Sequence, residues 1–417
     1  MWDEKTIQEK IAKQKAFFKT GATLDLKFRR AQLLKLKRAV IANQGKIEAA
    51  LKEDLGRSEE EAYFCDVGTI ILEVNEALRN LKRWAKPKTL YSGLVCFPSI
   101  FTKIYSLPYG NALIISPFNF PFLLSLGVLI YAIAGGNTAI IKASSKSASS
   151  TFALREIIAE TFDEEYVLVI DGGHDIADML LRSRFDKIFY TGSPKVGVHV
   201  MEEAAKNLTP VTLELGGENG NWAIVRKDAD IQDAARKIAF FKICNSGQIC
   251  INVNQVAIER EAAPAFLEAL EKEIVRQIGE HPLRNDEYPH LIGKKAYQSC
   301  AEEAKLYQDR IVFGGQGDEE SLRYEPTIIY PVKEDEPIVN HELFNPLLPI
   351  VPFDDVDELL NKIGEREHGL ALYLFTKDKK WAKKVMRTQQ YGGGCVNEVC
   401  LHMMVKGAPF GEIGRAS

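Results

Sequence analysis

The pattern of hydrophobic and polar residues changes from helical spacing to a β-rich composition near residue 88. From about Lys5 to Lys86, apolar residues recur at helical spacing, and the first proline after Lys5 is Pro87. From about Thr89 to Leu107 the sequence becomes rich in β-formers and is broken by Pro98-Ser99. This pattern predicts a helical N-terminal part followed by a hairpin or two edge strands.

From Asn111 onward, short apolar runs alternate with helical stretches. We expect strands at 112–115, 138–142, 166–170, 187–190, 222–225, 254–258, 324–330 and 370–375. We expect helices at 121–134, 147–161, 174–184, 229–243, 262–278 and 377–389. Strands that alternate with helices imply βαβ units and parallel sheets with covered faces. The sequence therefore predicts two consecutive α/β units, with a seam near Gly216-Gly217.

Composition narrows the class of protein. The most apolar stretch, 120–134, is shorter than the roughly 20 residues of a membrane span and predicts a buried helix. The formal charge is −4, from 53 basic and 57 acidic residues, and gives no field that favours nucleic acid or an anionic membrane as a partner. The N-terminus has no secretory pattern. We therefore expect a cytoplasmic protein without a membrane span.

The spacing of cysteines and histidines bears on the cellular compartment and on metal binding. The seven cysteines are odd in number and contain no Cys-x-x-Cys pair, which is typical of a reducing compartment. The seven histidines form no metal-binding grouping, so we expect no metal site.

Two segments carry the candidate chemistry. The run from Asn245 to Cys250 follows a predicted helix with small and polar residues, which predicts a loop that presents the Cys250 thiol near backbone N–H groups. The alternative is an inert core cysteine, which we expect for Cys244. Glu214 is the only charge in an apolar strand that ends in two glycines. It faces either solvent or a cleft, and desolvation in a cleft would suit it to act as a general base.

Three further positions fit a cofactor or an oxyanion, and each also has an ordinary structural interpretation. Asn119 lies between aromatics and prolines ahead of an apolar helix, where it is either a turn residue or an oxyanion donor. Lys142 ends a strand of the predicted parallel sheet, where ligands bind in such folds, but a lysine there is usually a surface charge. Ser193-Pro194 suits the start of a helix that offers N–H groups to a phosphate.

These five segments, in this order, closely resemble the aldehyde dehydrogenase superfamily. The stretch 188–193 is most similar to its class 3 branch, and the resemblance extends through 342–350, 369–373 and 409–411. It implies an α/β fold with a Rossmann-like cofactor-binding domain (1–88 and 108–215), an α/β catalytic domain (216–398) and a small β oligomerisation unit (89–107 with 399–417). It also implies NAD or NADP as cofactor, an aldehyde substrate and a homodimer.

The resemblance assigns a role to each candidate. Cys250 would be the nucleophile that forms a thiohemiacetal and then a thioester. Glu214 would activate the hydrolytic water, and Asn119 with the Cys250 backbone N–H would hold the oxyanion. The cofactor contacts would be Lys142 at the adenosine ribose, Ser193 at the pyrophosphate, and Glu342 with Phe344 at the nicotinamide ribose.

The chain departs from the family pattern at three places. Ala143-Ser144-Ser145 replaces the usual Pro-Ser-Glu, and loss of that carboxylate predicts that NADP is accepted. Asn345-Pro346 replaces Gly-Pro, and Phe410-Gly411-Glu412 replaces Phe-Gly-Gly. Both changes lie on the nicotinamide or substrate side of the family's site, so the sequence does not identify which aldehyde is the substrate. The sequence stops at Ser417 inside a motif that the family continues, so we expect either a longer natural protein or a truncated C-terminus.

Two other functions are compatible with the sequence. An acylating, CoA-dependent aldehyde dehydrogenase would pass the thioester to a thiol, although such relatives generally lack a base at the position of Glu214. A non-catalytic family member would explain the departures at Ser145, Asn345 and Glu412, but it would not need Cys250, Glu214 and Asn119 together.

Overall fold

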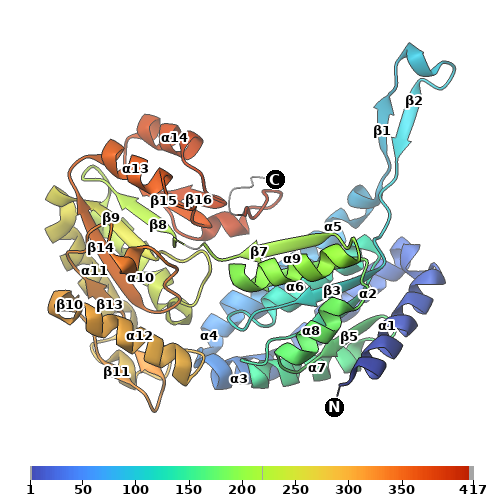
Figure 1. Ribbon diagram of the computed structural model, residues 1–417, viewed down its shortest axis with the longest axis horizontal. Coiled ribbons are helices and arrows are strands. Elements are labelled where there is room, and N and C mark those ends of the chain that lie inside the picture. Colours follow the sequence, from blue (N-terminus) through green and yellow to red (C-terminus); the bar gives the residue numbers. More distant parts are fainter. Residues whose placement is uncertain (1, 218, 413–417) are drawn as a thin grey trace. The chain divides into compact units, whose positions relative to one another are not determined.

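The computed structural model describes residues 2–217 and 219–412. The chain divides into two compact units (Figure 1). The first comprises Met1–Asp54, Glu59–Thr191 and Val196–Leu213, and the second Leu55–Ser58, Gly192–Lys195 and Glu214–Ser417. Part of the predicted oligomerisation unit, residues 413–417, lies outside the described residues.

A five-stranded sheet with the strand order β5-β4-β3-β6-β7 forms the centre of the first unit, and β5, β4, β3 and β6 pair in parallel. β3 pairs with β4 in the register Ile115↔Lys142, and the strands β3 and β4 are almost entirely buried. Strands buried along their whole length are expected where helices cover both faces of a parallel sheet. The strands are β3 (Asn111–Ile115), β4 (Thr138–Lys142), β5 (Val167–Ile170), β6 (Lys187–Gly192) and β7 (Val211–Leu215).

Helices before and between these strands complete the layer structure. They are α1 (Glu4–Lys19), α2 (Leu26–Ala42), α3 (Gln44–Leu55), α4 (Glu59–Ala62), α5 (Gly68–Ala85), α6 (Leu123–Gly135), α7 (Ala148–Thr161), α8 (His174–Arg182) and α9 (Pro194–Lys206). α6 carries the most apolar run of the sequence, and Leu126, Leu129, Ile130 and Ile133 on it are fully buried. The predicted buried helix is confirmed. None of the described helices is long and apolar enough to cross a membrane.

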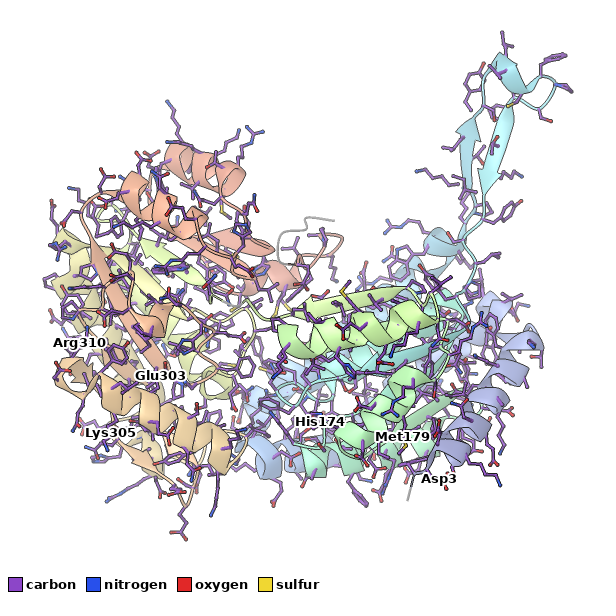
Figure 2. The ribbon with its side chains drawn as sticks, in the orientation of Figure 1. Asp3, His174, Met179, Glu303, Lys305 and Arg310 are labelled. Atoms are coloured by element: carbon purple, nitrogen blue, oxygen red, sulfur yellow. The ribbon has the colours of Figure 1, made fainter. Side chains whose placement is uncertain are left out.

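Carboxylates satisfy the first N–H groups of several helices. Asp3, labelled in Figure 2, accepts from the Thr6 N–H at 2.7 Å and caps α1. Asp54 accepts from Ser149 and Ser150 at the start of α7, at 3.1 and 2.7 Å. A negative charge at a helix N-terminus both pairs otherwise unsatisfied donors and complements the helix dipole.

The predicted hairpin is confirmed. β1 (Lys88–Tyr91) pairs with β2 (Phe101–Ile104) in antiparallel register, and every residue of both strands is exposed (Figure 1). Its connection exposes large apolar side chains, with Leu94 at 77% and Val95 at 97% of full exposure.

A seven-stranded sheet forms the core of the second unit, with the order β10-β13-β14-β9-β8-β15-β16. β10 is antiparallel to β13, and the other neighbouring strands of this sheet are parallel. The strands are β8 (Trp222–Val225), β9 (Gln255–Glu259), β10 (Ile311–Phe313), β13 (Thr327–Ile329), β14 (Leu347–Phe353), β15 (Ala371–Phe375) and β16 (Gly393–Val396), with a separate pair β11 (Gly317–Asp318) and β12 (Arg323–Tyr324). The helices are α10 (Ile231–Ile243), α11 (Ala263–Ile278), α12 (Lys294–Leu306), α13 (Val356–Gly364) and α14 (Lys379–Thr388).

Candidate active site

The loop that follows α10 has an unusual backbone. Asn245, Ser246 and Gly247 have φ values of 50°, 52° and 76°, so three consecutive residues are left-handed. Only glycine adopts this region without a steric penalty, and strained residues of other types persist where the surroundings hold them. A Cβ at Gly247 would lie 2.2 Å from the carbonyl oxygen of Asn345. The backbone therefore needs glycine at this position.

Buried side chains hold this strained loop in place. The Arg57 guanidinium, which is 1% exposed, donates through Nε to Asn245 Oδ1 at 3.0 Å. Asn245 Nδ2 donates to the Gln248 carbonyl at 3.0 Å, and Gln248 Nε2 donates back to the Asn245 carbonyl at 2.9 Å. A fully paired buried network of this kind fixes one conformation.

A second set of contacts fixes the backbone at the thiol itself. Asn221 Nδ2 donates to the carbonyls of Cys250 and Asn252, at 2.8 Å each, and its Oδ1 accepts from the Ala371 N–H at the start of β15. The Tyr373 hydroxyl donates to the Ile251 carbonyl at 2.5 Å. These contacts tie the Cys250 segment to the central sheet of the second unit.

Cys250 is partly exposed, as the sequence predicts, whereas Cys244 is buried at 6% exposure. Burial raises the pKa of the Cys250 thiol to about 12, and the carboxylates of Glu342 and Glu214 act in the same direction. The backbone N–H groups of Ile251 and Cys250 act the other way. The predicted N–H groups near the sulfur are therefore present, but desolvation outweighs them and keeps the thiol protonated at neutral pH.

Glu214 lies on β7, which is the predicted strand. Its Oε2 is buried and receives no hydrogen bond from the described residues. Burial raises the pKa of Glu214 to about 8, and the charge of Glu412 and a hydrogen bond with that residue add to the effect. The carboxyl is thus desolvated rather than on a solvated face, which is the environment that suits a general base near neutral pH.

Glu342 offers a second buried carboxyl in the same unit. Burial raises the pKa of Glu342 to about 8, and its Oε1 is buried with no hydrogen-bond partner among the described residues. A Cβ at Gly216 would lie 2.6 Å from both carboxyl oxygens of Glu342, so only glycine leaves room for that group. An unsatisfied buried acceptor suits a hydroxyl-bearing ligand, and the assignment of Glu342 and Phe344 to the nicotinamide ribose stays a prediction.

The remaining predicted residues lie where parallel strands end or helices begin. Lys142 is the last residue of β4 and is 5% exposed. Its Nζ donates to the Ala143 carbonyl at 2.8 Å. Burial lowers the pKa of Lys142, against the charges of Asp171 and Asp175. Asn119 is 3% exposed, four residues ahead of α6, and Ser193 directly precedes α9.

Cys250, Glu214 and Glu342 all belong to the second unit, and the charges of both carboxylates raise the pKa of the Cys250 thiol. Sequence reasoning missed the residues that hold them: Arg57, Asn221, Gln248 and Tyr373. Their buried polar side chains have no short-range pattern, because each bonds to a segment distant in sequence. Glu412 departs from the family pattern, but no sequence signal predicts its interaction with Glu214.

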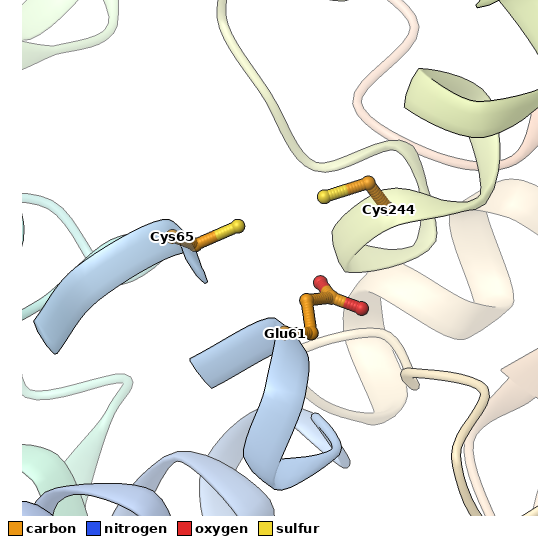
Figure 3. Close-up of side chains that lie close together, drawn as sticks. All are labelled: Glu61, Cys65 and Cys244. Atoms are coloured by element: carbon orange, nitrogen blue, oxygen red, sulfur yellow. The ribbon is translucent and has the colours of Figure 1, made fainter. Parts of the chain in front are cut away.

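One group of potential metal ligands occurs in the described residues, namely Glu61, Cys65 and Cys244 (Figure 3). Glu61 belongs to α4 and Cys65 to the π-helical turn that follows it, both in the first unit, whereas Cys244 follows α10 in the second. We assign no metal site to these side chains, and the expectation of a metal-free protein stays a prediction.

The sequence matches the aldehyde dehydrogenase family over residues 1–415. The chain belongs to this family. It is therefore an NAD(P)-dependent aldehyde dehydrogenase, with NAD or NADP as its cofactor.

Individual relatives confirm the class 3 resemblance. The chain is 37% identical over 410 residues to 4,4'-diaponeurosporen-aldehyde dehydrogenase of Staphylococcus aureus (strain NCTC 8325 / PS 47), covering 98% of this chain and 88% of that protein. It is 38% identical over 401 residues to human aldehyde dehydrogenase family 3 member B1, covering 95% of this aldehyde dehydrogenase and 84% of the human protein.

Solved structures share the fold. The substrate-bound state of Staphylococcus aureus AldH matches with a TM-score of 0.95 and 37% identity, covering 98% of this chain and 89% of that one. The glyceraldehyde-3-phosphate dehydrogenase GapN from Methanocaldococcus jannaschii, complexed with NADP, matches with a TM-score of 0.84 and 23% identity, covering 95% and 86%. The predicted fold class is confirmed.

Proposed function

We propose that this aldehyde dehydrogenase oxidises an aldehyde to the carboxylic acid through a thioester on Cys250, which is hydrolysed by water that Glu214 activates. The observation that carries the proposal is that the Cys250 segment is fixed by hydrogen bonds and that Glu214 in the same unit has a desolvated carboxyl. Both belong to one unit, and Glu214, when ionised, raises the pKa of the Cys250 thiol. This is the arrangement of a nucleophile with an adjacent base.

In the first step, the Cys250 thiolate adds to the aldehyde carbon, and the carbonyl oxygen becomes an oxyanion. The backbone N–H of Cys250 faces the sulfur and is one donor for that oxygen. The side-chain amide of Asn119 is the second donor, as the family resemblance implies. Preorganised donors of this kind are worth on the order of 10²–10³ in rate each.

Glu342 and Glu214 are compatible with thiolate chemistry despite their negative charge. With pKa values raised to about 8, both are largely protonated at neutral pH and repel the thiolate little. In the hydrolytic step, ionised Glu214 takes a proton from water, the hydroxyl attacks the thioester carbon, and the Cys250 sulfur leaves. A pKa near 8 makes Glu214 a stronger base than an exposed glutamate.

The cofactor residues are assigned by the same resemblance. Lys142 holds the adenosine ribose, Ser193 the pyrophosphate, and Glu342 with Phe344 the nicotinamide ribose. The bound nicotinamide supplies the two-electron acceptor for the oxidation. Ser145 stands where the family pattern has a carboxylate that would repel a 2′-phosphate, so we expect NADP to be accepted alongside NAD. A preference for NAD above about 100-fold would contradict this.

The predicted division of the chain extends this proposal to its parts. We assign cofactor binding to 1–88 and 108–215, catalysis to 216–398, and dimerisation to 89–107 with 399–417. The exposed apolar side chains of the hairpin support a homodimer, because apolar patches on a surface mark interaction sites. All seven cysteines carry free thiols, which supports a reducing cytoplasm.

An assay of NAD(P)H absorbance with a panel of aldehydes tests the proposal, with NAD and NADP in parallel, for the wild type and Cys250→Ala. Turnover in the wild type that disappears in Cys250→Ala is expected. Cys244→Ala is the matched control and should retain turnover, because Cys244 is a buried neighbour. Turnover only when CoA is added would favour the acylating alternative, and no turnover in any condition would favour the non-catalytic one.

A further inference from the structure

The segment that carries Glu412 is locked against the start of β16. Gly411 has a φ of 94°, and a Cβ there would lie 2.1 Å from the Gly392 carbonyl oxygen. In return, a Cβ at Gly392 would lie 3.0 Å from the Glu412 nitrogen. Two backbones approach this closely only where both residues are glycine. The position of the Glu412 backbone is therefore set by the sheet of the second unit.

The Glu412 side chain reaches the end of β7. The N–H of Leu215 donates to Glu412 Oε2 at 3.0 Å, which anchors the carboxylate beside the residue that follows Glu214. The Glu412 carboxyl also hydrogen-bonds with the Glu214 carboxyl. A hydrogen bond between two carboxyl groups needs one proton, because two ionised carboxylates repel each other.

We propose that Glu412 is a positioning residue of the hydrolytic step: its carboxylate, anchored on the Leu215 N–H, holds the Glu214 carboxyl through one shared proton. This inference rests on the proposed function, in which Glu214 is the base. The sequence does not predict this pair. Glu412 stands where the family pattern has a glycine.

The shared proton also allows Glu214 to accept a proton from the hydrolytic water. When the proton of the pair moves fully to Glu412, the Glu214 carboxylate is ready to accept. An O–H bond of water then breaks, an O–H bond to Glu214 forms, and the hydroxyl adds to the thioester carbon. The Glu214 proton passes to the departing Cys250 sulfur, and the proton on Glu412 returns to the shared position. In the whole step a C–O bond forms and the C–S bond to Cys250 breaks, while the Glu214–Glu412 pair only transfers protons and ends as it began.

Three other titratable groups of the second unit, Cys250, Glu342 and His402, are not among the causes that shift the pKa of Glu214. Cys250 stays protonated until high pH, and Glu342 lies against Gly216. His402 is 6.1 Å from the Phe410 ring between centroids, and burial lowers its pKa, so it is neutral at pH 7. Glu412 is the group whose charge and hydrogen bond both act on Glu214.

The pH profile of aldehyde oxidation tests the inference, measured at saturating aldehyde and cofactor for the wild type, Glu412→Gln and Glu412→Gly. Either substitution removes the charge that favours protonated Glu214, so the rising limb of kcat should move to lower pH by about one unit or more. The amplitude of the first-turnover NAD(P)H burst should stay unchanged, because that burst precedes hydrolysis. Glu412→Asp, which keeps a carboxylate, should restore part of the wild-type profile.

The matched control is Glu398→Gln, which removes a carboxylate paired with Lys237 in the same C-terminal region. It should leave the profile unchanged. An independent readout is the infrared C=O band of a protonated carboxyl at pH 7 in the protein alone. The band that Glu214→Gln removes from the wild type should also be weakened in Glu412→Gln.

The two proposals fail in different ways. If Glu214→Gln hydrolyses the thioester at the wild-type rate, the proposed function of Glu214 is wrong whatever Glu412 does. If Glu214→Gln blocks hydrolysis but the profiles of Glu412→Gln and Glu412→Gly and the infrared band stay at wild-type values, Glu412 is a surface residue and this inference is wrong. Circular dichroism on each variant separates a shifted profile from loss of folding, and Glu412→Asp keeps the test available if the other two unfold.

Discussion

At the scale of single residues, the site depends on desolvation. Burial is the largest cause of the raised pKa values of Cys250, Glu214 and Glu342. A desolvated thiol near two carboxyls is a poor nucleophile while it is protonated and a strong one once its proton is lost. The resting protein therefore keeps a low-reactivity thiol, and the fraction of thiolate rises with pH.

The alkylation rate of Cys250 tests this electrostatic account. Because its pKa is raised to about 12, the rate of reaction with iodoacetamide should rise roughly tenfold per pH unit from pH 7 to 9. Glu342→Gln removes a negative charge that acts on the sulfur, so it should increase the rate, most clearly above pH 8, where wild-type Glu342 is ionised. Mass spectrometry of the Cys250 peptide gives the rate, with Cys250→Ala as the blank. A fast rate that does not change with pH would mean that the thiolate is already formed.

At the scale of elements, periodicity predicted most of the α/β pattern. The strands at 138–142 and 222–225 were predicted with their observed bounds, because an apolar run between turns identifies a buried strand. The predicted strand 324–330 was wrong as one element: β12 and β13 are separate strands, interrupted at Glu325-Pro326. α12, α13, β14 and β16 were not predicted. β14 contains Pro349 and Pro352, and β16 begins with two glycines. Proline and glycine are not typical of buried strands, so the sequence pattern does not predict either strand.

The sequence predicted the candidate catalytic residues but not the side chains that position them. The resemblance identified Cys250, Glu214 and Glu342 by local motifs. The side chains that position them act through contacts between distant segments, such as Arg57 with Asn245, which no spacing rule reveals. Electrostatic effects depend on burial, and burial follows from the whole fold.

The hairpin β1–β2 makes a prediction at this scale. If its exposed apolar connection contacts a second copy, a charge there should prevent dimerisation, because an ammonium group is costly to bury without a partner. Val95→Lys should therefore shift the wild-type particle from twice the chain mass of 46.7 kDa to one chain mass in light scattering after gel filtration. Ser99→Lys places the same charge on an exposed polar position of the hairpin and should remain dimeric. A monomeric wild type would contradict the proposed dimer.

At the scale of the whole molecule, the two units divide the predicted chemistry. The first contains Lys142 and Asn119, and the second contains Ser193, Glu214, Cys250 and Glu342. The nucleophile and the base thus belong to one unit, but Glu214 lies on β7 of the five-stranded sheet and the Cys250 segment is tied through Asn221 to β15 of the seven-stranded sheet. Catalysis depends on a fixed geometry between the attacking sulfur and the hydrolytic carboxyl.

Acyl-enzyme trapping with Glu214→Gln tests the central claim most directly. The variant is mixed with aldehyde and NAD(P), quenched in acid, and measured by intact-protein and peptide mass spectrometry. The account predicts one burst of NAD(P)H, no further turnover, and the mass of the acyl group on the Cys250 peptide, while the wild type turns over without accumulating it. Continuous turnover of Glu214→Gln at the wild-type rate, or an acyl group on a different residue, would contradict the account.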